Sequence, residues 1–248
     1  MSKPRIIGVI PARLESTRLP GKVLLDVAGK ALVERVYEAV LECPLLDELL
    51  VATDSPQVLE YCEARGIRSM RTGTHPSGSD RLYEVLERTR GDLYVNVQGD
   101  EPTVGQDHLR LLLEPLLEER ATVSTLCVAV GEEEAADPNV VKVVCDEMGR
   151  ALYFSRHPIP FHRGTEGDRI HFKHIGLYAY RREALRRFHA LPPGRLERAE
   201  RLEQLRFLEN GISVAVSRTT QDTIGVDTAE DLERAIEYFR GRIAARES

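Results

Sequence analysis

The sequence lacks both clustered cysteines and long apolar runs. The apolar stretch near the N-terminus is far shorter than the core of a signal peptide, and no other stretch reaches membrane-spanning length. The cysteines are widely spaced, form no C-x-x-C pair and lie among apolar residues, which favours reduced, buried thiols. We therefore expect a cytoplasmic protein that does not insert into membranes. The four cysteines are Cys43, Cys62, Cys127 and Cys145.

Two common phosphate-binding motifs are also missing. In a Walker A loop, a glycine stands five residues before the Gly-Lys pair, and a serine or threonine follows that pair. Here Ser16 stands five residues before Gly21, and Val23 follows Lys22. No G-x-G-x-x-G sequence opens a helix, so the main support for a dinucleotide-dependent oxidoreductase is absent. A bound phosphate would have to be held by side-chain cations and loop amides.

The chain has no excess of positive charge. Its 248 residues carry a formal net charge of -6, so nothing global attracts nucleic acid or an anionic membrane. Hydrophobic residues make up 42% and charged residues 30%, which are ordinary values for a soluble globular protein. We expect one substantial core and a single domain over residues 1–248.

A local cationic cluster is present near the N-terminus. Residues 9–22 read VIPARLESTRLPGK, with Arg13, Arg18 and Lys22 against a single acidic residue, Glu15. The apolar run that Pro11 ends predicts a buried strand, and ligands of α/β sheets gather beyond the carboxyl ends of strands. The loop is therefore a candidate polyphosphate site, with an ordinary solvated basic loop as the alternative.

Strand-like and helix-like segments alternate in the first hundred residues. Ser55 and Pro56 provide an N-cap and a first helical residue, and Gly66 and Gly91 follow two of the helices. This alternation predicts β-α-β units and a parallel sheet. We expect strands at 6–10, 49–53 and 93–97 and helices at 30–41, 56–66 and 79–90.

The middle of the chain is richer in β-forming residues, roughly from 123 to 180. Runs at 123–130, 140–145 and 151–155 favour antiparallel strands, and the segment FKHIGLYAYR is also strand-like. The segment 157–168 contains prolines and glycines without periodicity, which predicts a surface loop. The remaining residues predict helices at 181–188 and 197–208, a strand at 212–216 and a last helix from Thr228.

Two aspartates stand just past apolar strands. Asp100 follows YVNVQ through Gly99, and Asp227 lies in TIGVDTAED at the start of the last helix. Each has a structural alternative, since Asp100 could cap a turn and Asp227 could complement the helix dipole. Magnesium is usually held by one or two carboxylates plus substrate phosphates and waters. Two strand-end aspartates opposite the cationic loop would describe a nucleoside triphosphate site.

The histidines do not indicate a metal. His171 and His174 are three residues apart on a predicted strand, which places them on opposite faces. A histidine at position 174 is more often a structural hydrogen-bonding residue, and His75 lies among turn residues, where a surface role is expected. Arg156 precedes the long loop and could meet an anionic sugar or pair with a nearby carboxylate.

Taken together, these segments make the sequence resemble the 3-deoxy-manno-octulosonate cytidylyltransferase family. The segments that carry the resemblance span nearly the whole chain, and KHIGLYAYR and RLEQLR are the ones that separate this family from the sialic acid cytidylyltransferases. The others are VIPARLESTRLPGK, VATDS, HPSGSDR, VNVQGDEP, NVVKVVCDEMGRALYFSRHPIP and GVDTAEDLE.

The resemblance implies a Rossmann-like α/β nucleotide-diphospho-sugar transferase fold, with a mostly parallel sheet, helices on both faces and a β-rich insertion at about 123–180. It implies a magnesium-dependent enzyme whose substrates are CTP and 3-deoxy-D-manno-octulosonate (Kdo) and whose products are CMP-Kdo, for lipopolysaccharide synthesis, and pyrophosphate. It also implies a homodimer. Alternatives are another acidic sugar, such as 8-amino-Kdo or a sialic acid, and a catalytically silent nucleotide-sugar binding protein.

The resemblance also assigns roles to individual residues. Asp100 and Asp227 would hold magnesium and, with Arg13 and Lys22, form the catalytic group. Ala12, Arg13, Lys22, Ser79, Arg81 and Gln98 would bind the nucleotide. The residues around the sugar would be Gln98, Arg156, His174, Tyr178, Glu203 and Gln204. From sequence alone, Glu203 and Gln204 fall in a strongly charged helix, whose default is a solvated face.

Overall fold

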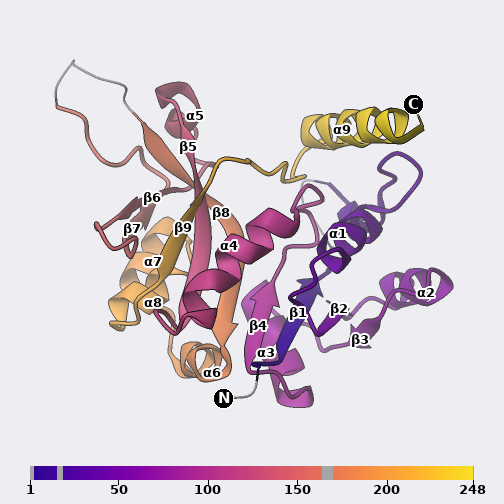
Figure 1. The fold of residues 1–248 in the computed structure, drawn as a ribbon, viewed down its shortest axis with the longest axis horizontal. Helices are drawn as coiled ribbons and strands as arrows, with labels where there is room; N and C mark the ends of the chain where they lie inside the picture. The colour runs from indigo at the N-terminus through magenta and orange to yellow at the C-terminus, as the bar shows by residue number, and fades with distance from the viewer. Residues whose placement is uncertain (1–2, 16–18, 164–169, 248) are drawn as a thin grey trace. The chain divides into compact units, whose positions relative to one another are not determined.

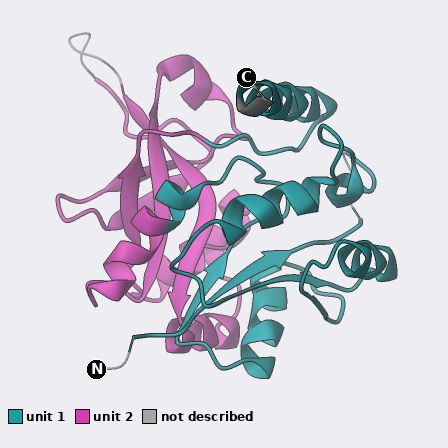
Figure 2. Ribbon diagram, turned by 45° about the vertical axis from the view of Figure 1, so that its right-hand side comes forward, with its two compact units in different colours: residues 1–109, 223–248 teal, residues 110–222 magenta. Residues whose placement is uncertain are grey.

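Residues 1–109 and 223–248 together form one compact unit, and residues 110–222 form another (Figure 2). We call them unit 1 and unit 2. The computed structural model describes residues 3–15, 19–163 and 170–247. Arg18, one of the three loop cations, therefore lies outside the described residues, as does part of the loop predicted at 157–168. That residues 1–248 behave as a single domain stays a prediction.

Unit 1 is built on a parallel sheet (Figure 1). Its strands lie in the order β3-β2-β1-β4, and all neighbours are parallel. Strands β1 and β2 are apolar and almost wholly buried, as expected where both faces of a sheet are covered. The predicted alternation of strand and helix is confirmed, and only the short β3 had no apolar signal. The elements are β1 (Ile6–Pro11), β2 (Glu48–Thr53), β3 (Ser69–Arg71), β4 (Leu93–Asn96), η1 (Lys22–Leu24), α1 (Leu32–Leu41), α2 (Pro56–Ala64) and α3 (Gly78–Arg88).

Unit 2 contains the β-rich part of the chain. Strand β5 pairs antiparallel with β8 and parallel with β9, while β6 pairs antiparallel with β7 and β8. Strand β9 begins at Ala215 rather than at Ile212 as predicted. Its strands are β5 (Val123–Val130), β6 (Lys142–Cys145), β7 (Ala151–Ser155), β8 (His171–Arg181) and β9 (Ala215–Thr219). Its helices are α5 (Glu132–Ala136), α6 (Arg182–Ala190), α7 (Arg195–Glu200) and α8 (Leu205–Glu209). A further helix, α4 (Gln106–Leu117), had not been predicted; it begins in unit 1 and continues into unit 2.

The charged segment after α6 is not the single helix over 197–208 that its sequence predicts. It forms α7 and α8, because Arg201 adopts a left-handed backbone with φ 54° and ψ 49°. The N–H of Leu202 then donates to the carbonyl oxygen of Glu197 at 3.2 Å, which closes α7. Glu203 and Gln204 therefore lie in a turn, and Gln204 is the residue before α8.

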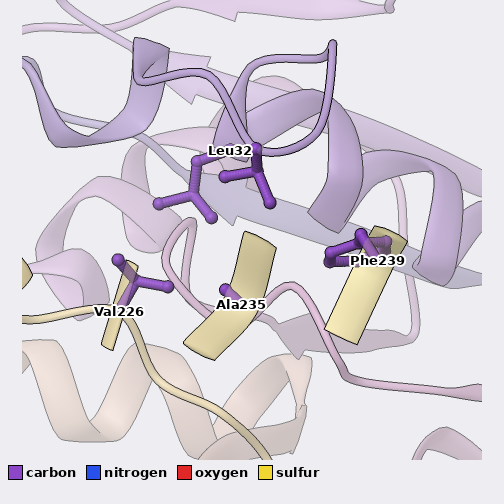
Figure 3. Close-up of a cluster of buried hydrophobic side chains, with 5 residues drawn as sticks. Leu32, Val226, Ala235 and Phe239 are labelled. Atoms are coloured by element: carbon purple, nitrogen blue, oxygen red, sulfur yellow. The ribbon is translucent and has the colours of Figure 1, made fainter. Parts of the chain in front are cut away.

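The last helix, α9 (Ala229–Glu247), begins at the predicted capping residues. Thr228 Oγ1 accepts from the N–H of Asp231 at 3.2 Å, and Asp231 Oδ2 accepts from the N–H of Thr228 at 3.0 Å. Figure 3 shows side chains of α1 and α9 pointing toward one another. This buried cluster ties the segment after Lys22 to the segment that carries Asp227. Its members are Val27, Leu32, Val226, Ala235 and Phe239.

Each described helix is either too short or too polar to cross a bilayer.

Candidate active site

Lys22, Asp100 and Asp227 form a charged cluster in unit 1. The Lys22 ammonium donates to Asp100 Oδ2 at 2.5 Å and to Asp227 Oδ1 at 2.9 Å. The Lys22 side chain is only 11% exposed. Burial by itself would lower the pKa of this ammonium, but the charges and hydrogen bonds of the two carboxylates outweigh it and raise the pKa above its ordinary value. Lys22 is therefore fully charged at neutral pH and holds both aspartates.

Backbone contacts bring the two aspartates together. The N–H of Val226 donates to the carbonyl oxygen of Asp100 at 2.9 Å, and the N–H of Ile224 donates to Thr103 Oγ1 at 2.7 Å. The strand-like segment before α9 is thereby fastened to the loop after β4. This attachment places both predicted metal ligands, and it does not involve the side chain of either aspartate.

A glycine sets the position of Asp100. A Cβ on Gly99 would lie 2.9 Å from the carbonyl oxygen of Pro11 at the end of β1. Because a carbon atom cannot approach a backbone oxygen that closely without displacing it, only glycine allows the ends of β1 and β4 to lie this near. Asp100 therefore directly follows a point of close backbone approach between the ends of β1 and β4.

The two aspartates fit a magnesium site. Carboxylate oxygens are the protein ligands that magnesium prefers, and Asp100 and Asp227 already converge on one cation, the Lys22 ammonium. Among the described residues, no group of three or more His, Cys, Asp or Glu side chains could hold a metal ion. A divalent ion here would therefore need further ligands from a bound substrate or water.

Arg13 and Arg81 line a pocket of about 300 Å³ in unit 1. Arg13 is exposed, whereas the Arg81 side chain is 4% exposed and donates to Asp54 Oδ1 at 3.0 Å. The pocket follows β1, β2 and β3, whose carboxyl ends lie on the same edge because the strands are parallel. Its lining consists of Arg13, Leu14, Glu15, Asp54, Ser55, Thr74, His75 and Arg81.

Asp54 and His75 are pocket residues that the sequence analysis did not assign to the site. Burial would raise the pKa of Asp54, but hydrogen bonding from Thr74 and the charge of Arg81 outweigh it and lower that pKa. His75 Nε2 lies 2.5 Å from Glu84 Oε2 and its side chain is 23% exposed, so its role is not merely that of a surface turn residue. Asp54 could have been found, since it follows strand VAT as Asp100 follows YVNVQ.

The remaining predicted nucleotide residues lie at the same ends of β1 and β4. Ala12 is fully buried, and its N–H donates to the carbonyl oxygen of Ala52 at 2.9 Å, so this amide is already used. The amide group of Gln98 lies 3.6 to 3.7 Å from the place of a Cβ on Gly78, at the start of α3. Ser79 is half-buried in the first turn of the same helix.

In unit 2, β8 brings His174 and Tyr178 together, with ring centroids 5.4 Å apart. The β5–β8 register shifts beside Thr125, so an irregularity of the strand lies between these two residues. His174 Nε2 lies 3.0 Å from Thr125 Oγ1, and burial lowers the His174 pKa to about 3. Burial, with smaller contributions from the charges of Tyr180 and Glu203, raises the pKa of Tyr178. Both rings are therefore neutral at physiological pH.

Arg156 follows β7 and is held by backbone carbonyl groups. Its Nε donates to the carbonyl oxygen of Glu200 at 2.8 Å, and its Nη1 donates to that of Pro138 at 3.0 Å. The sequence left two alternatives for Arg156, an anionic sugar or a nearby carboxylate, and among the described residues its guanidinium bonds carbonyl oxygens and no carboxylate. Gln204 is buried and Glu203 half-buried in the turn before α8, so neither lies on the solvated helix face that the sequence suggested.

Comparisons with known proteins point to cytidylyltransferases. A family model described as cytidylyltransferase matches residues 7–218. A 3-deoxy-manno-octulosonate cytidylyltransferase of Koribacter versatilis (strain Ellin345) is 49% identical over 239 residues, which cover 96% of this chain and 91% of that protein. One from Escherichia coli is 44% identical over 236 residues, covering 94% of this chain and 95% of that protein.

Solved structures give the same result. A structure of CMP:2-keto-3-deoxy-manno-octonic acid synthetase complexed with CTP is 41% identical, with a TM-score of 0.92, and the match covers 96% of this chain and 99% of that chain. A 4-diphosphocytidyl-2C-methyl-D-erythritol synthase from Anaerococcus prevotii is only 13% identical, with a TM-score of 0.67 over 96% of this chain and all of that one (100%), so that likeness concerns the fold alone. The predicted α/β fold class is confirmed.

Proposed function

This chain belongs to the 3-deoxy-manno-octulosonate cytidylyltransferase family, and on that premise we propose that it transfers CMP from CTP to the anomeric hydroxyl of Kdo. The products are CMP-Kdo, for lipopolysaccharide synthesis, and pyrophosphate. The observation that carries the proposal is the convergence of Asp100 and Asp227 on Lys22, beyond the carboxyl end of a parallel sheet. Such an arrangement suits a triphosphate with its cation.

Unit 1 would bind the nucleotide. Arg13 and Lys22 would bind the triphosphate, and Ser79, Arg81 and Gln98 would contact the cytidine. Because the Ala12 N–H is already bonded to Ala52, Ala12 would contribute its backbone carbonyl or its close packing rather than its amide. The ion pair with Asp54 fixes the Arg81 guanidinium, which leaves its orientation set before a ligand arrives.

Unit 2 would supply the residues that recognise the sugar. Arg156 carries a charge without a carboxylate partner among the described residues, so it suits the carboxylate of an acidic sugar. His174 and Tyr178 would present neutral rings, and Glu203 and Gln204 would offer hydrogen-bonding groups from the turn before α8. The neutral side chains of His174 and Tyr178 can hydrogen-bond a sugar hydroxyl without leaving an unpaired charge buried.

The chemistry is a displacement at the α-phosphorus of CTP. The anomeric oxygen of Kdo forms a bond to this phosphorus, the bond to the departing pyrophosphate oxygen breaks, and the hydroxyl proton passes to solvent water. Magnesium held by Asp100 and Asp227 would neutralise charge on the phosphate oxygens. Arg13 and Lys22 would add positive charge beside the same groups, and the positioning of the two substrates would provide most of the rate.

A coupled assay of pyrophosphate release tests the proposal. Purified protein with CTP, Kdo and magnesium chloride should release pyrophosphate and yield CMP-Kdo, identified by mass spectrometry. No release under these conditions would contradict the activity and favour a silent nucleotide-sugar binding protein. Competition among Kdo, 8-amino-Kdo and a sialic acid would then show whether another acidic sugar is preferred.

We also propose a cytoplasmic homodimer. In support, unit 2 exposes large apolar side chains on and near the β6–β7 hairpin, where Met148 is 74% and Leu152 61% exposed. Light scattering on the purified protein should give twice the chain mass of 27.9 kDa, and the single-chain mass would contradict the dimer.

A further inference from the structure

We propose that Lys142 and Glu200 are positioning residues that hold Arg156 in place for the carboxylate of the acidic sugar. The inference rests on the proposed function, because it assumes that Arg156 meets this carboxylate. It goes further, since neither residue is a predicted ligand of either substrate. All the contacts that carry it lie within unit 2.

Lys142 is a fully buried lysine on β6 whose ammonium has no carboxylate partner among the described residues. It donates instead to three backbone carbonyl oxygens: those of Asp137 at 3.0 Å, Val140 at 2.5 Å and Arg156 at 2.6 Å. An ammonium has three donor hydrogens, so all of them are used. The lysine thus joins the backbone of Arg156 to the 137–140 loop.

The same loop also holds the guanidinium of Arg156. Pro138, next to Asp137, accepts from Arg156 Nη1 at 3.0 Å. Lys142 therefore fixes both the main chain of Arg156 and the loop that holds its side chain. Burial lowers the pKa of Lys142, the nearby charge of Arg156 lowers it further, and the charges of Asp137 and Glu200 oppose this.

Glu200, at the end of α7, holds Arg156 from the other side. Its Oε2 accepts from the N–H of Arg156 at 2.9 Å, and its carbonyl oxygen accepts from Arg156 Nε at 2.8 Å. Its Oε1 accepts from Ser155 Oγ at 2.7 Å, which fixes the carboxylate in turn. Glu200 thereby holds both the backbone and the side chain of Arg156.

These contacts leave one edge of the guanidinium available. The N–H, the carbonyl oxygen, Nε and Nη1 of Arg156 all have partners, whereas Nη2 has none among the described residues. An arginine whose other donors are occupied is set in one orientation, so little side-chain entropy is lost when an anion binds to the remaining edge. The arrangement suits a small carboxylate.

Replacement of Lys142 by methionine tests the inference. Met keeps the length and the apolar stem of lysine but leaves three carbonyl oxygens without their donor. In the pyrophosphate assay, Lys142→Met should raise the KM for Kdo about tenfold while the KM for CTP stays within about twofold. Glu200→Gln, a more exposed position that is expected to fold, should move the same constant in the same direction.

Two controls separate positioning from general destabilisation. Lys173 pairs with Lys142 in the β6–β8 ladder but is bonded to Glu134 and Asp222, so Lys173→Met should leave both KM values unchanged. In an Arg156→Met background, Lys142→Met should cause no further rise in the KM for Kdo, because the group on which it acts is gone.

The outcomes are distinct. If wild-type protein releases no pyrophosphate, the proposed function is contradicted, and the positioning role, which depends on it, is contradicted too. If wild-type protein is active but Lys142→Met and Glu200→Gln change the two KM values equally, or only lower the thermal midpoint, the positioning role is overturned. Additive effects of Lys142→Met and Arg156→Met on the KM for Kdo would overturn it as well.

Discussion

The ammonium of Lys22 lies 2.5 Å from Asp100 Oδ2, across 78 positions of sequence. One residue stands at the start of a short 3-10 helix and the other follows β4, so the contact joins two loops at the same edge of the sheet. Since Asp227 bonds the same ammonium, removing Lys22 leaves two carboxylates without their shared cation, whereas removing either aspartate leaves a one-to-one ion pair.

Replacing Asp100 with Asn should remove activity and spare the fold. An amide oxygen binds magnesium more weakly than a carboxylate, so pyrophosphate release should fall about a hundredfold or more. Lys22 keeps Asp227 as a partner, so the thermal midpoint should change little. Asp107→Asn, an exposed change in the first turn of α4, serves as the matched control. Unchanged turnover in Asp100→Asn would refute the metal role.

Replacing Lys22 with Met should make stability depend on magnesium. Without the ammonium, Asp100 and Asp227 would repel each other across a partly buried site, and a divalent cation would relieve this. Thermal unfolding without nucleotide should show a larger rise in midpoint on addition of magnesium for Lys22→Met than for wild type. Equal shifts in both proteins would mean that the ammonium and the metal do not share ligands.

Replacing Gly99 with Ala should cost both stability and activity. The new Cβ would lie 2.9 Å from the Pro11 carbonyl oxygen, so the end of β1 or β4 must shift, at a cost of about 1–3 kcal/mol. That shift would move Asp100, the next residue. Urea unfolding and pyrophosphate release measure the two effects. In Gly105→Ala the nearest atom to the new Cβ is 3.9 Å away, so this control should behave like wild type, and a Gly99→Ala protein that did so too would contradict the steric argument.

Sequence patterns were sufficient for most of unit 1 because its strands are buried on both faces. Continuous apolar runs marked β1, β2 and β4, and the residues just past them marked the candidate site. What the patterns could not provide was the bonding of Lys22 to both aspartates. That contact depends on the attachment of residues 224–226 to the loop after β4, which no local pattern encodes.

The errors in unit 2 have a different cause. The helical periodicity of residues 197–208 continues through Arg201, but a buried ion pair between Arg206 and Glu197 requires the chain to fold back there. Tertiary contacts therefore override a strong local preference. Strand β9 is likewise set by its pairing with β5, from Ser124 opposite Ala215 onward, rather than by the apolar alternation that begins earlier at Ile212.

Acid should destabilise the protein through His174. Its pKa is lowered by burial to about 3, below the unfolded value of 6.5, so its contribution is complete above pH 6.5 and is lost as the pH falls toward 3. One such group changes the free energy of unfolding by about 1.4 kcal/mol per pH unit, or about 2 kcal/mol between pH 6.5 and 5. Urea unfolding at these two pH values should show this loss.

The loss should be smaller in His174→Gln, which has no group to protonate at this position. His157→Gln, at an exposed position before the loop, should retain the wild-type loss. If His174→Gln lost as much stability as wild type over this range, the acid sensitivity would have to come from other groups.

Unit 1 is made of residues that precede and residues that follow unit 2 in the sequence, so the ribosome cannot complete unit 1 before it has made unit 2. A ribosome makes Lys22 and Asp100 well before Asp227, and the whole of unit 2 is made in between. While unit 2 emerges, the nascent chain can pair Lys22 with Asp100 only. The second carboxylate and the buried partners of Leu32 on α9 arrive afterwards, so the bonding of one ammonium by two carboxylates can begin only once translation has passed Asp227.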